Sequence, residues 1–158
     1  MRGRPMHHVA LTPRDHEASL RFYQEGLGLQ VLIDLDGLTG KWTHIFGAPS
    51  DELRSIFLGS PDYGNAGVVE LVLFADDPGA ADRRRAPAEL VNGFFLLSFY
   101  VGDVTATIAQ LEELGVAGDV RTTTIGEGEG AFTVGTVRDP DGTLIELVGI
   151  PPEQGFGD

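Results

Sequence analysis

The stretch HHVALTPRDHEASLRFYQEGLGLQV, residues 7–31, decides the fold because its plan occurs twice in the chain. Its apolar pattern predicts a strand, then a helix that begins after Asp15, and a stop at the glycines of GLGL before a second strand. Residues 95–120, FLLSFYVGDVTATIAQLEELGVAGDV, repeat this order, and Asp103 takes the position of Asp15. A short acidic side chain at a helix start accepts the first free N–H groups. The sequence therefore indicates an internal duplication.

Both copies also end alike, on Glu-Leu-Val at residues 70–72 and 146–148. Strand-like segments fill the space between the helix and this ending, so each half is predicted to be βαβββ and the fold α+β. The segments are LQVLIDL (29–35) and RSIFLG (54–59) in the first half, and AGDVRTTT (117–124) and AFTVGTV (131–137) in the second. Residues 36–53 are expected to form an irregular or helical insert. The expected organisation is a first module at 1–74, a linker at 75–92, a second module at 93–151 and a tail at 152–158.

Composition limits the possible functions. The 158 residues contain no cysteine, so a thiolate metal site and a thiol nucleophile are excluded. Acidic residues outnumber basic ones by 24 to 11, and the net charge of −13 makes nucleic acids and anionic membranes improbable partners. No run of about 18 apolar residues, as a membrane span requires, occurs, and no signal peptide is recognisable. We expect a cytoplasmic protein that binds a small molecule.

Two glutamates stand in apolar surroundings: Glu70 in VVELVLF (68–74) and Glu146 in TLIELVGI (143–150). An ionised carboxylate in an apolar layer costs several kcal/mol unless a partner compensates its charge, and neither stretch contains Lys or Arg. Strand alternation points His8 to the face opposite Val9. A divalent cation shared by His8, Glu70 and Glu146 would compensate both carboxylates, because such metals accept carboxylate oxygen and imidazole nitrogen together.

The same alternation separates two faces in the first strand of each half. Val9 and Leu11, with Leu97 and Phe99 in the second half, are expected to be buried against helices. The opposite face carries His8 in the first half and, in the second half, Leu96, Ser98 and Tyr100. This second face is the more polar one in both halves and is expected to line a concavity.

A family resemblance now follows from two motifs. The pattern His-x-x-Leu-x-x-x-Asp-x-x-x-Ser-x-x-Phe-Tyr-x-x-x-Leu-Gly over residues 8–28, together with DPDGTLIELV at 139–148, resembles the vicinal oxygen chelate superfamily. This superfamily includes glyoxalase I, extradiol dioxygenases and bleomycin resistance proteins. The resemblance implies that two tandem βαβββ modules form a curved open barrel around a central cavity. It also implies a metal held by the first and last strands of each module, and commonly a homodimer.

Carried onto this chain, the four ligand positions are His8, Glu70, Leu96 and Glu146. Leucine cannot bind a metal, so Leu96 replaces an expected histidine and counts against extradiol dioxygenase chemistry. One histidine and two glutamates could still hold Ni, Co, Mn, Zn, Mg or Fe; the alternative is that no metal binds. Further candidates for a pocket lining are Ser98, Tyr100, His44, Trp42 and Phe132. Strand alternation points His7 away from the cavity. The arginines of RRR at 83–85 are interpreted as part of a solvated linker.

Two functions stay open at this point. The first is a divalent-metal-dependent isomerase or lyase acting on a small oxygenated substrate, in which the resemblance implies that Glu146 moves a proton and Glu70 is a ligand. The second is a non-catalytic protein that binds an antibiotic or another aromatic natural product. Two carboxylates in apolar strands favour the enzyme, since a binding pocket alone does not require them.

Overall fold

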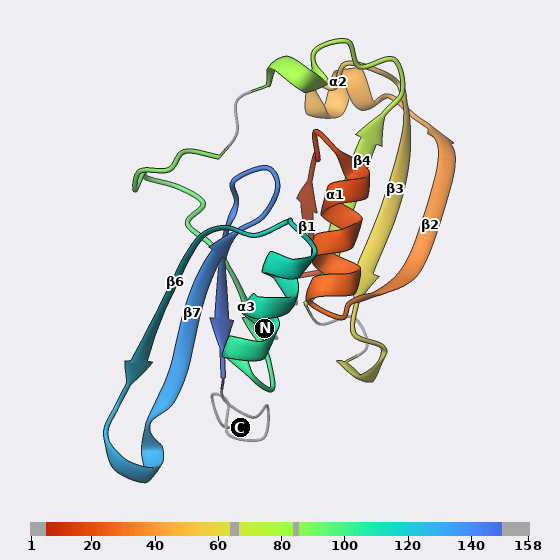
Figure 1. The fold of residues 1–158 in the computed structure, drawn as a ribbon. Helices are drawn as coiled ribbons and strands as arrows, with labels where there is room; N and C mark the ends of the chain where they lie inside the picture. Colours follow the sequence, from red (N-terminus) through yellow and green to blue (C-terminus); the bar gives the residue numbers. More distant parts are fainter. Residues whose placement is uncertain (1–5, 64–66, 84–85, 150–158) are drawn as a thin grey trace, which may run out of the picture. The chain divides into compact units, whose positions relative to one another are not determined.

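Two four-stranded sheets, one in each half of the chain, carry the fold (Figure 1). The computed structural model describes residues 6–63, 67–83 and 86–149. Contacts within the chain divide it into two units. The first contains Met1–His16 and Tyr23–Arg83, and the second contains Glu17–Phe22 and Arg84–Asp158. Among the described residues, no helix is long and apolar enough to cross a membrane.

The first sheet has the strand order β1-β4-β3-β2. Strand β1 runs parallel to β4, whereas the other neighbours are antiparallel. A helix, α1 (His16–Leu20), begins directly after Asp15, as predicted, and continues as a π-helical turn over Arg21–Gly26. The predicted order strand, helix and three strands is therefore confirmed. The strands are β1 (Val9–Leu11), β2 (Gln30–Thr39), β3 (Glu52–Gly59) and β4 (Val69–Phe74).

The segment expected to be an insert is partly strand. Strand β2 continues through Asp36 and Gly37 to Thr39, because an irregularity in the β2–β3 register between Leu35 and Leu38 absorbs the turn-like Asp-Gly pair. A short helix, α2 (Trp42–Phe46), follows and ends at Gly47. Strand β2 is the outermost strand of its sheet, and all ten of its residues are exposed. Its exposed apolar side chains are Val31, Leu32, Ile33, Leu35 and Leu38.

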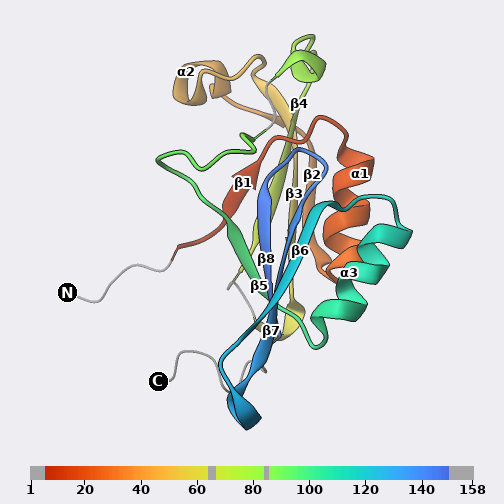
Figure 2. The same ribbon diagram turned by 60° about the vertical axis from the view of Figure 1, so that its left-hand side comes forward.

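The second sheet repeats this topology in the order β5-β8-β7-β6 (Figure 2). Its helix, α3 (Val104–Glu113), is capped by Asp103, whose carboxylate accepts the backbone N–H of Ala106 at 3.0 Å. Helix α3 contacts β7 at Gly135, where a Cβ atom would lie 2.8 Å from Val104 Cγ1. Glycine therefore permits the close approach of helix and sheet. The strands are β5 (Leu97–Tyr100), β6 (Gly118–Ile125), β7 (Phe132–Arg138) and β8 (Leu144–Val148).

The predicted alternation of faces holds in β1 and β5, but the burial is weaker than expected. Val9 and Leu11 are half-buried while Ala10 between them is exposed, and β5 alternates in the same way. The positions expected to be buried are thus only half-buried, because β1 and β5 stand at the ends of their sheets. The largest fully buried side chains, Phe22 and Tyr23, lie on the π-helical turn. The other fully buried apolar side chains lie on inner strands and on α3: Ile56, Leu58, Leu71, Leu111, Val137, Ile145 and Leu147.

The motif DPDGT forms the turn between β7 and β8. The carboxylate of Asp139, which is 6% exposed, accepts the backbone N–H of Asp141 at 3.0 Å and that of Thr143 at 2.7 Å. Gly142 adopts a φ of 88°, which favours glycine. This part of the motif is therefore explained by the turn, and it fixes the start of the strand that carries Glu146.

Candidate functional site

His8 and Glu70 meet in the first unit. Strand pairing places Ala10 beside Glu70, and His8 lies two residues before Ala10, immediately before β1 begins. His8 Nε2 lies 2.9 Å from Glu70 Oε2, with the side chains 33% and 13% exposed. Ser55 on the neighbouring strand β3 donates its hydroxyl to the other carboxylate oxygen, Oε1. The carboxylate of Glu70 is thus compensated within its own unit by a histidine and a serine.

His7 contributes to the same cluster. Its Nδ1 atom lies 2.6 Å from Nδ1 of His8, so one ring N–H donates to the nitrogen of the other ring. Both rings also meet the ring of Phe57 edge to face. Alternation along a strand assigned His7 to the opposite face, but β1 begins only at Val9, so that rule does not apply to His7. Both nitrogens of His8 are therefore engaged, which fixes the orientation of its ring.

A hollow of about 580 Å³ opens beside the His8–Glu70 pair. Its lining is largely apolar, and we call it the β1–α2 hollow after two of the elements that line it. Three segments of the first unit form it: the strand β1 region, strand β4 and the segment around α2. The lining residues are His8, Ala10, Thr12, Leu38, Trp42, Phe46, Gly47, Ala48, Pro49, Leu53, Glu70, Val72, Phe74 and Arg83. A cavity of this size and composition is typical of small-molecule sites.

Trp42 is held in a defined position in this hollow. Its indole N–H donates to the carbonyl oxygen of Leu38 at 3.3 Å. Its ring stacks on that of Phe46, with centroids 5.6 Å apart and planes within 3° of parallel, as residues four apart on a helix allow. Gly40 lies against the indole, since a Cβ atom there would be 2.5 Å from the ring. The lining thus contains a preformed aromatic surface.

Asp51 anchors the helix that carries this surface. Its carboxylate Oδ1 accepts the backbone N–H of Thr43 at 2.8 Å, in the first turn of α2. Hydrogen bonds from the backbone and side chain of Thr43 lower the pKa of Asp51 below its usual value. The anchor is therefore present at neutral pH, where the carboxylate is ionised.

Arg83 lines the hollow too, although the sequence interpretation placed it in a solvated linker. Its guanidinium forms an ion pair with Asp77, whose side chain is 9% exposed. Sequence reasoning also missed Ser55. Neither residue carries a local signal, because Ser55 reaches Glu70 only through the pairing of β3 with β4, and Arg83 stands in a charged segment without periodicity.

Glu146 has a different setting in the second unit. Strand pairing places Ser98 directly beside Glu146, and the Ser98 hydroxyl donates to Oε2 at 2.7 Å. Leu96 stands just before β5, at the position that matches His8, so this unit has no histidine there. Tyr100, on the same face, is 46% exposed. The second unit therefore pairs its carboxylate with a hydroxyl where the first uses an imidazole as well.

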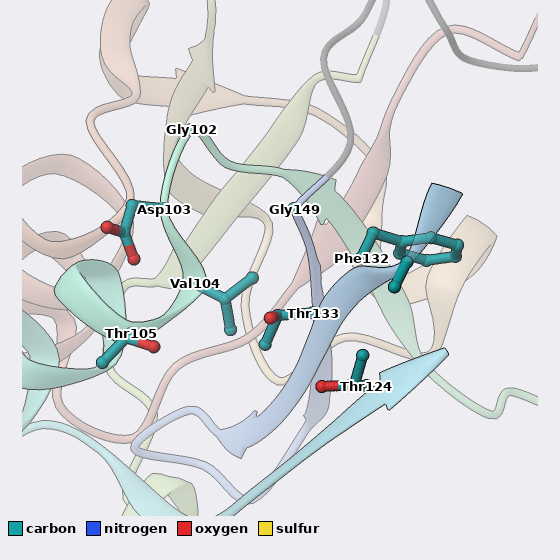
Figure 3. A pocket seen from close by; sticks show the side chains of 9 residues that line it. Gly102, Asp103, Val104, Thr105, Thr124, Phe132, Thr133 and Gly149 are labelled. Atoms are coloured by element: carbon teal, nitrogen blue, oxygen red, sulfur yellow. The ribbon is translucent and has the colours of Figure 1, made fainter. Parts of the chain in front are cut away.

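The remaining predicted pocket residues lie elsewhere. His44 is exposed on α2 and does not line the β1–α2 hollow. Phe132 lies at a separate pocket of about 300 Å³ in the second unit, shown in Figure 3 between the start of α3 and the strands β6 and β7. Thr124 and Thr133 line it as well, and Asp103 uses its carboxylate there for the helix cap. The structure thus brings together His8, Glu70 and Trp42 but places Phe132 in another pocket.

His8 and Glu70 fit a divalent metal as two of its ligands. They present an imidazole nitrogen and a carboxylate oxygen side by side, which is a donor set that Zn, Ni, Mn and Fe accept. Within residues 6–63, 67–83 and 86–149, however, no group of three or more His, Asp or Glu side chains is arranged to hold a metal. The described residues therefore bring together two candidate ligands, His8 and Glu70.

The profile of the Glyoxalase/Bleomycin resistance protein/Dioxygenase superfamily matches residues 6–147. The chain belongs to this superfamily. A lactoylglutathione lyase-like protein of Aspergillus terreus is 36% identical over 151 residues, which cover 92% of this chain and 75% of that protein. Glyoxalase I of Saccharomyces cerevisiae is 29% identical over 147 residues, and the match covers 90% of this chain but only 44% of the yeast protein. The resemblance inferred from the motifs is thereby confirmed.

Solved structures of the superfamily agree with this assignment. The trypanothione-dependent glyoxalase I of Leishmania major is 26% identical, with a TM-score of 0.59, over 92% of this chain and 86% of that one. A glyoxalase family protein of Bacillus cereus, at 22% identity, has a TM-score of 0.67 over 94% and 95% of the two chains, and it supports the fold alone. The α+β fold with two open four-stranded sheets is therefore that of the superfamily.

Proposed function

We propose that this superfamily member is a divalent-metal-dependent lyase or isomerase that acts on a small oxygenated substrate. The observation that supports it is the His8–Glu70 pair, 2.9 Å apart at the wall of the β1–α2 hollow. Relatives named lactoylglutathione lyase-like protein and glyoxalase I agree with a lyase class. A nitrogen and an oxygen donor beside a largely apolar cavity suit a metal site open to a small molecule.

In this proposal His8 and Glu70 are metal ligands, and Glu146 is the further ligand that the family resemblance implies. A divalent ion bound there would polarise a carbonyl or enediolate oxygen of the substrate. Ser55 holds the second carboxylate oxygen of Glu70, and His7 holds the second ring nitrogen of His8, so both ligands keep their orientation. The apolar side chains of the lining offer few hydrogen bonds, so a bound substrate would displace water from this wall.

Glu146 is the proposed base. A carboxylate can take a proton from the hydroxyl-bearing carbon next to a carbonyl and return it to the former carbonyl carbon. The hydroxyl proton passes to the former carbonyl oxygen, so the carbonyl double bond moves to the neighbouring carbon without net gain or loss of protons. Ser98 holds one oxygen of Glu146, leaving the other oxygen to accept the proton. Leu96, in place of a second histidine, continues to count against an extradiol dioxygenase.

Elemental analysis tests this function. The purified protein is dialysed in turn against Ni, Co, Mn, Zn and Mg, and metal content is measured for wild type, Glu70→Gln and Glu52→Gln. Glu52 is an exposed glutamate at the start of β3 and is the matched control. We expect a divalent ion in wild type and Glu52→Gln and its loss in Glu70→Gln. Wild type without metal under every condition would refute the proposal.

One observation favours a second function, a binding protein without chemistry. The stacked rings of Trp42 and Phe46 offer an aromatic surface in a largely apolar hollow, as an antibiotic or natural-product receptacle requires. A protein of this kind would bind its ligand equally well after Glu70→Gln and Glu146→Gln. Calorimetric titration of both variants separates it from the enzyme.

The proposed assembly is a homodimer. Strand β2 ends its sheet and exposes apolar side chains, and such an edge can pair with a second copy. Light scattering at micromolar concentration tests the dimer, and the mass of a single chain would contradict it. A cytoplasmic location stays an expectation from the sequence.

A further inference from the structure

The aromatic surface of the β1–α2 hollow is fixed in three ways. The Trp42 indole is bonded to Leu38, stacked on Phe46 and packed on Gly40, so its position does not depend on a ligand. Phe46 is 65% exposed, which leaves much of its ring uncovered. A fixed and accessible aromatic pair binds flat rings by stacking and by burial of apolar surface. This feature selects the shape of a ligand.

The charges of the hollow select against anionic ligands. Among the described lining residues, Arg83 is the single Lys or Arg, and its guanidinium already forms an ion pair with Asp77. Glu70 adds a carboxylate to the same lining, and the chain carries a net charge of −13. A glutathione adduct brings two carboxylates and one ammonium group, and its carboxylates would lose hydration here without gaining a strong cation.

Both features lie in one cavity. His8 and Glu70 are part of the lining on the strand side, and Trp42 and Phe46 are part of it on the α2 side. A single molecule in about 580 Å³ can therefore place a ring on the aromatic pair and oxygen atoms at the His8–Glu70 pair. We infer that the substrate is an uncharged, ring-bearing compound with neighbouring hydroxyl or carbonyl oxygens, and not a glutathione adduct. This inference deepens the proposed function and rests on it for the role of the oxygens.

Isothermal titration calorimetry tests the ligand class, with protein that has been dialysed against a divalent metal to load it. The probes are 2,3-dihydroxynaphthalene, a neutral ring compound with adjacent hydroxyls, and S-lactoylglutathione. We expect the naphthalenediol to bind about three- to tenfold more tightly than the thioester, which is the factor that one well-formed aromatic contact contributes.

Matched variants locate the binding. Phe46→Leu removes one ring of the stacked pair and should weaken the naphthalenediol about three- to tenfold. Phe94→Leu is the control, because Phe94 is similarly exposed, at 59%, but does not line the hollow. Gly40→Ala keeps both rings but displaces the indole, so it should weaken binding and also shift the emission of Trp42, the single tryptophan of the chain.

The outcomes separate this inference from the proposed function. Tighter binding of S-lactoylglutathione, or equal affinity of wild type and Phe46→Leu for the naphthalenediol, would overturn the ligand class and leave the metal-dependent enzyme standing. Selective naphthalenediol binding that depends on Phe46, in a protein that takes up no metal, would support the ligand class and refute the metal-dependent enzyme.

Discussion

Glu70 and Glu146 occupy matching positions of the two sheets, and their surroundings differ. Each lies in the strand that pairs in parallel with the first strand of its unit. Glu70 contacts an imidazole and a serine hydroxyl, whereas Glu146 contacts a serine hydroxyl. The comparison teaches that a repeated fold can keep one carboxylate position in both copies while the neighbouring residues give each carboxylate a different environment.

The neighbours follow from register. Ala10 and Ser98 are matched, because they stand beside Glu70 and Glu146, and so are His8 and Leu96 two residues earlier. In the first unit, His8 lies two residues before Ala10. In the second unit, Leu96 lies two residues before Ser98. Among the described residues the carboxylate of the first unit thus has an imidazole beside it, and that of the second has a hydroxyl; the proposed difference between the two glutamates rests on this.

The largest expected effect is a difference between the substitutions Glu146→Gln and Glu70→Gln. Glu146→Gln should slow proton exchange about 10²- to 10⁴-fold, because an amide cannot act as the base, and it should weaken metal binding less than Glu70→Gln does. Glu70→Gln should instead lose the metal. The first effect is measured by NMR, as the rate at which the CH₂ protons of α-hydroxyacetophenone (PhCOCH₂OH) exchange with deuterium from D₂O. Equal metal loss in both variants would show that the two carboxylates share one role.

The next effect concerns the matched positions Ile56 and Gly135, which stand opposite Leu71 and Leu147. Ile56 is buried, and Ile56→Ala should lower the free energy of unfolding by about 2 to 5 kcal/mol through a cavity. Gly135→Ala should lower it by about 1 to 3 kcal/mol for the opposite reason, overpacking against α3. Urea denaturation measures both, and a stabilising Gly135→Ala would contradict the close packing of α3 on β7.

A smaller effect is expected from making the two units more alike. Leu96→His restores the histidine that the family pattern predicts and should raise metal affinity by at least about tenfold, since even an indirect partner of a ligand changes affinity by about that factor. Competition with a chelator measures the affinity. Leu96→Gln is the control for polarity, and an increase of the same size in that variant would argue against ligation.

The smallest effect concerns an ion pair of the first sheet. Arg54 on β3 bonds both carboxylate oxygens of Asp34 on β2, at 2.9 and 2.7 Å, and lowers the pKa of that carboxyl. The pair's stabilisation is present above the ordinary carboxyl pKa of about 4 and is lost as pH falls through the lower folded value. Both side chains are 38% exposed, so Asp34→Asn should cost only about 0.2 to 1 kcal/mol at pH 7. Unfolding at pH 7 and pH 3 measures it, and an equal cost at both would exclude the ion pair.

Sequence reasoning succeeded where short-range rules decide the structure. The alternation that separates Ala10 from Val9 and Leu11, and the cap at Asp103, depend on neighbours in the chain. Sequence reasoning failed where the pairing between strands decides which side chains meet. Ser55 reaches Glu70 from 15 residues away through the β3–β4 register. Strand β2 runs through an Asp-Gly pair that normally marks a turn, because the irregular register with β3 accommodates it.

The exposed outer strand β2 has a consequence for handling the protein in solution. Val31 and Ile33 are 43% and 51% exposed in a strand that also presents a backbone edge. The net charge of −13 opposes contact between such edges by Coulomb repulsion, which acts over a Debye length of about 10 Å at 0.1 M salt and about 3 Å at 1 M. Ionic strength therefore sets the balance between colloidal repulsion and edge-to-edge association, and concentrated salt should shift this chain toward larger particles.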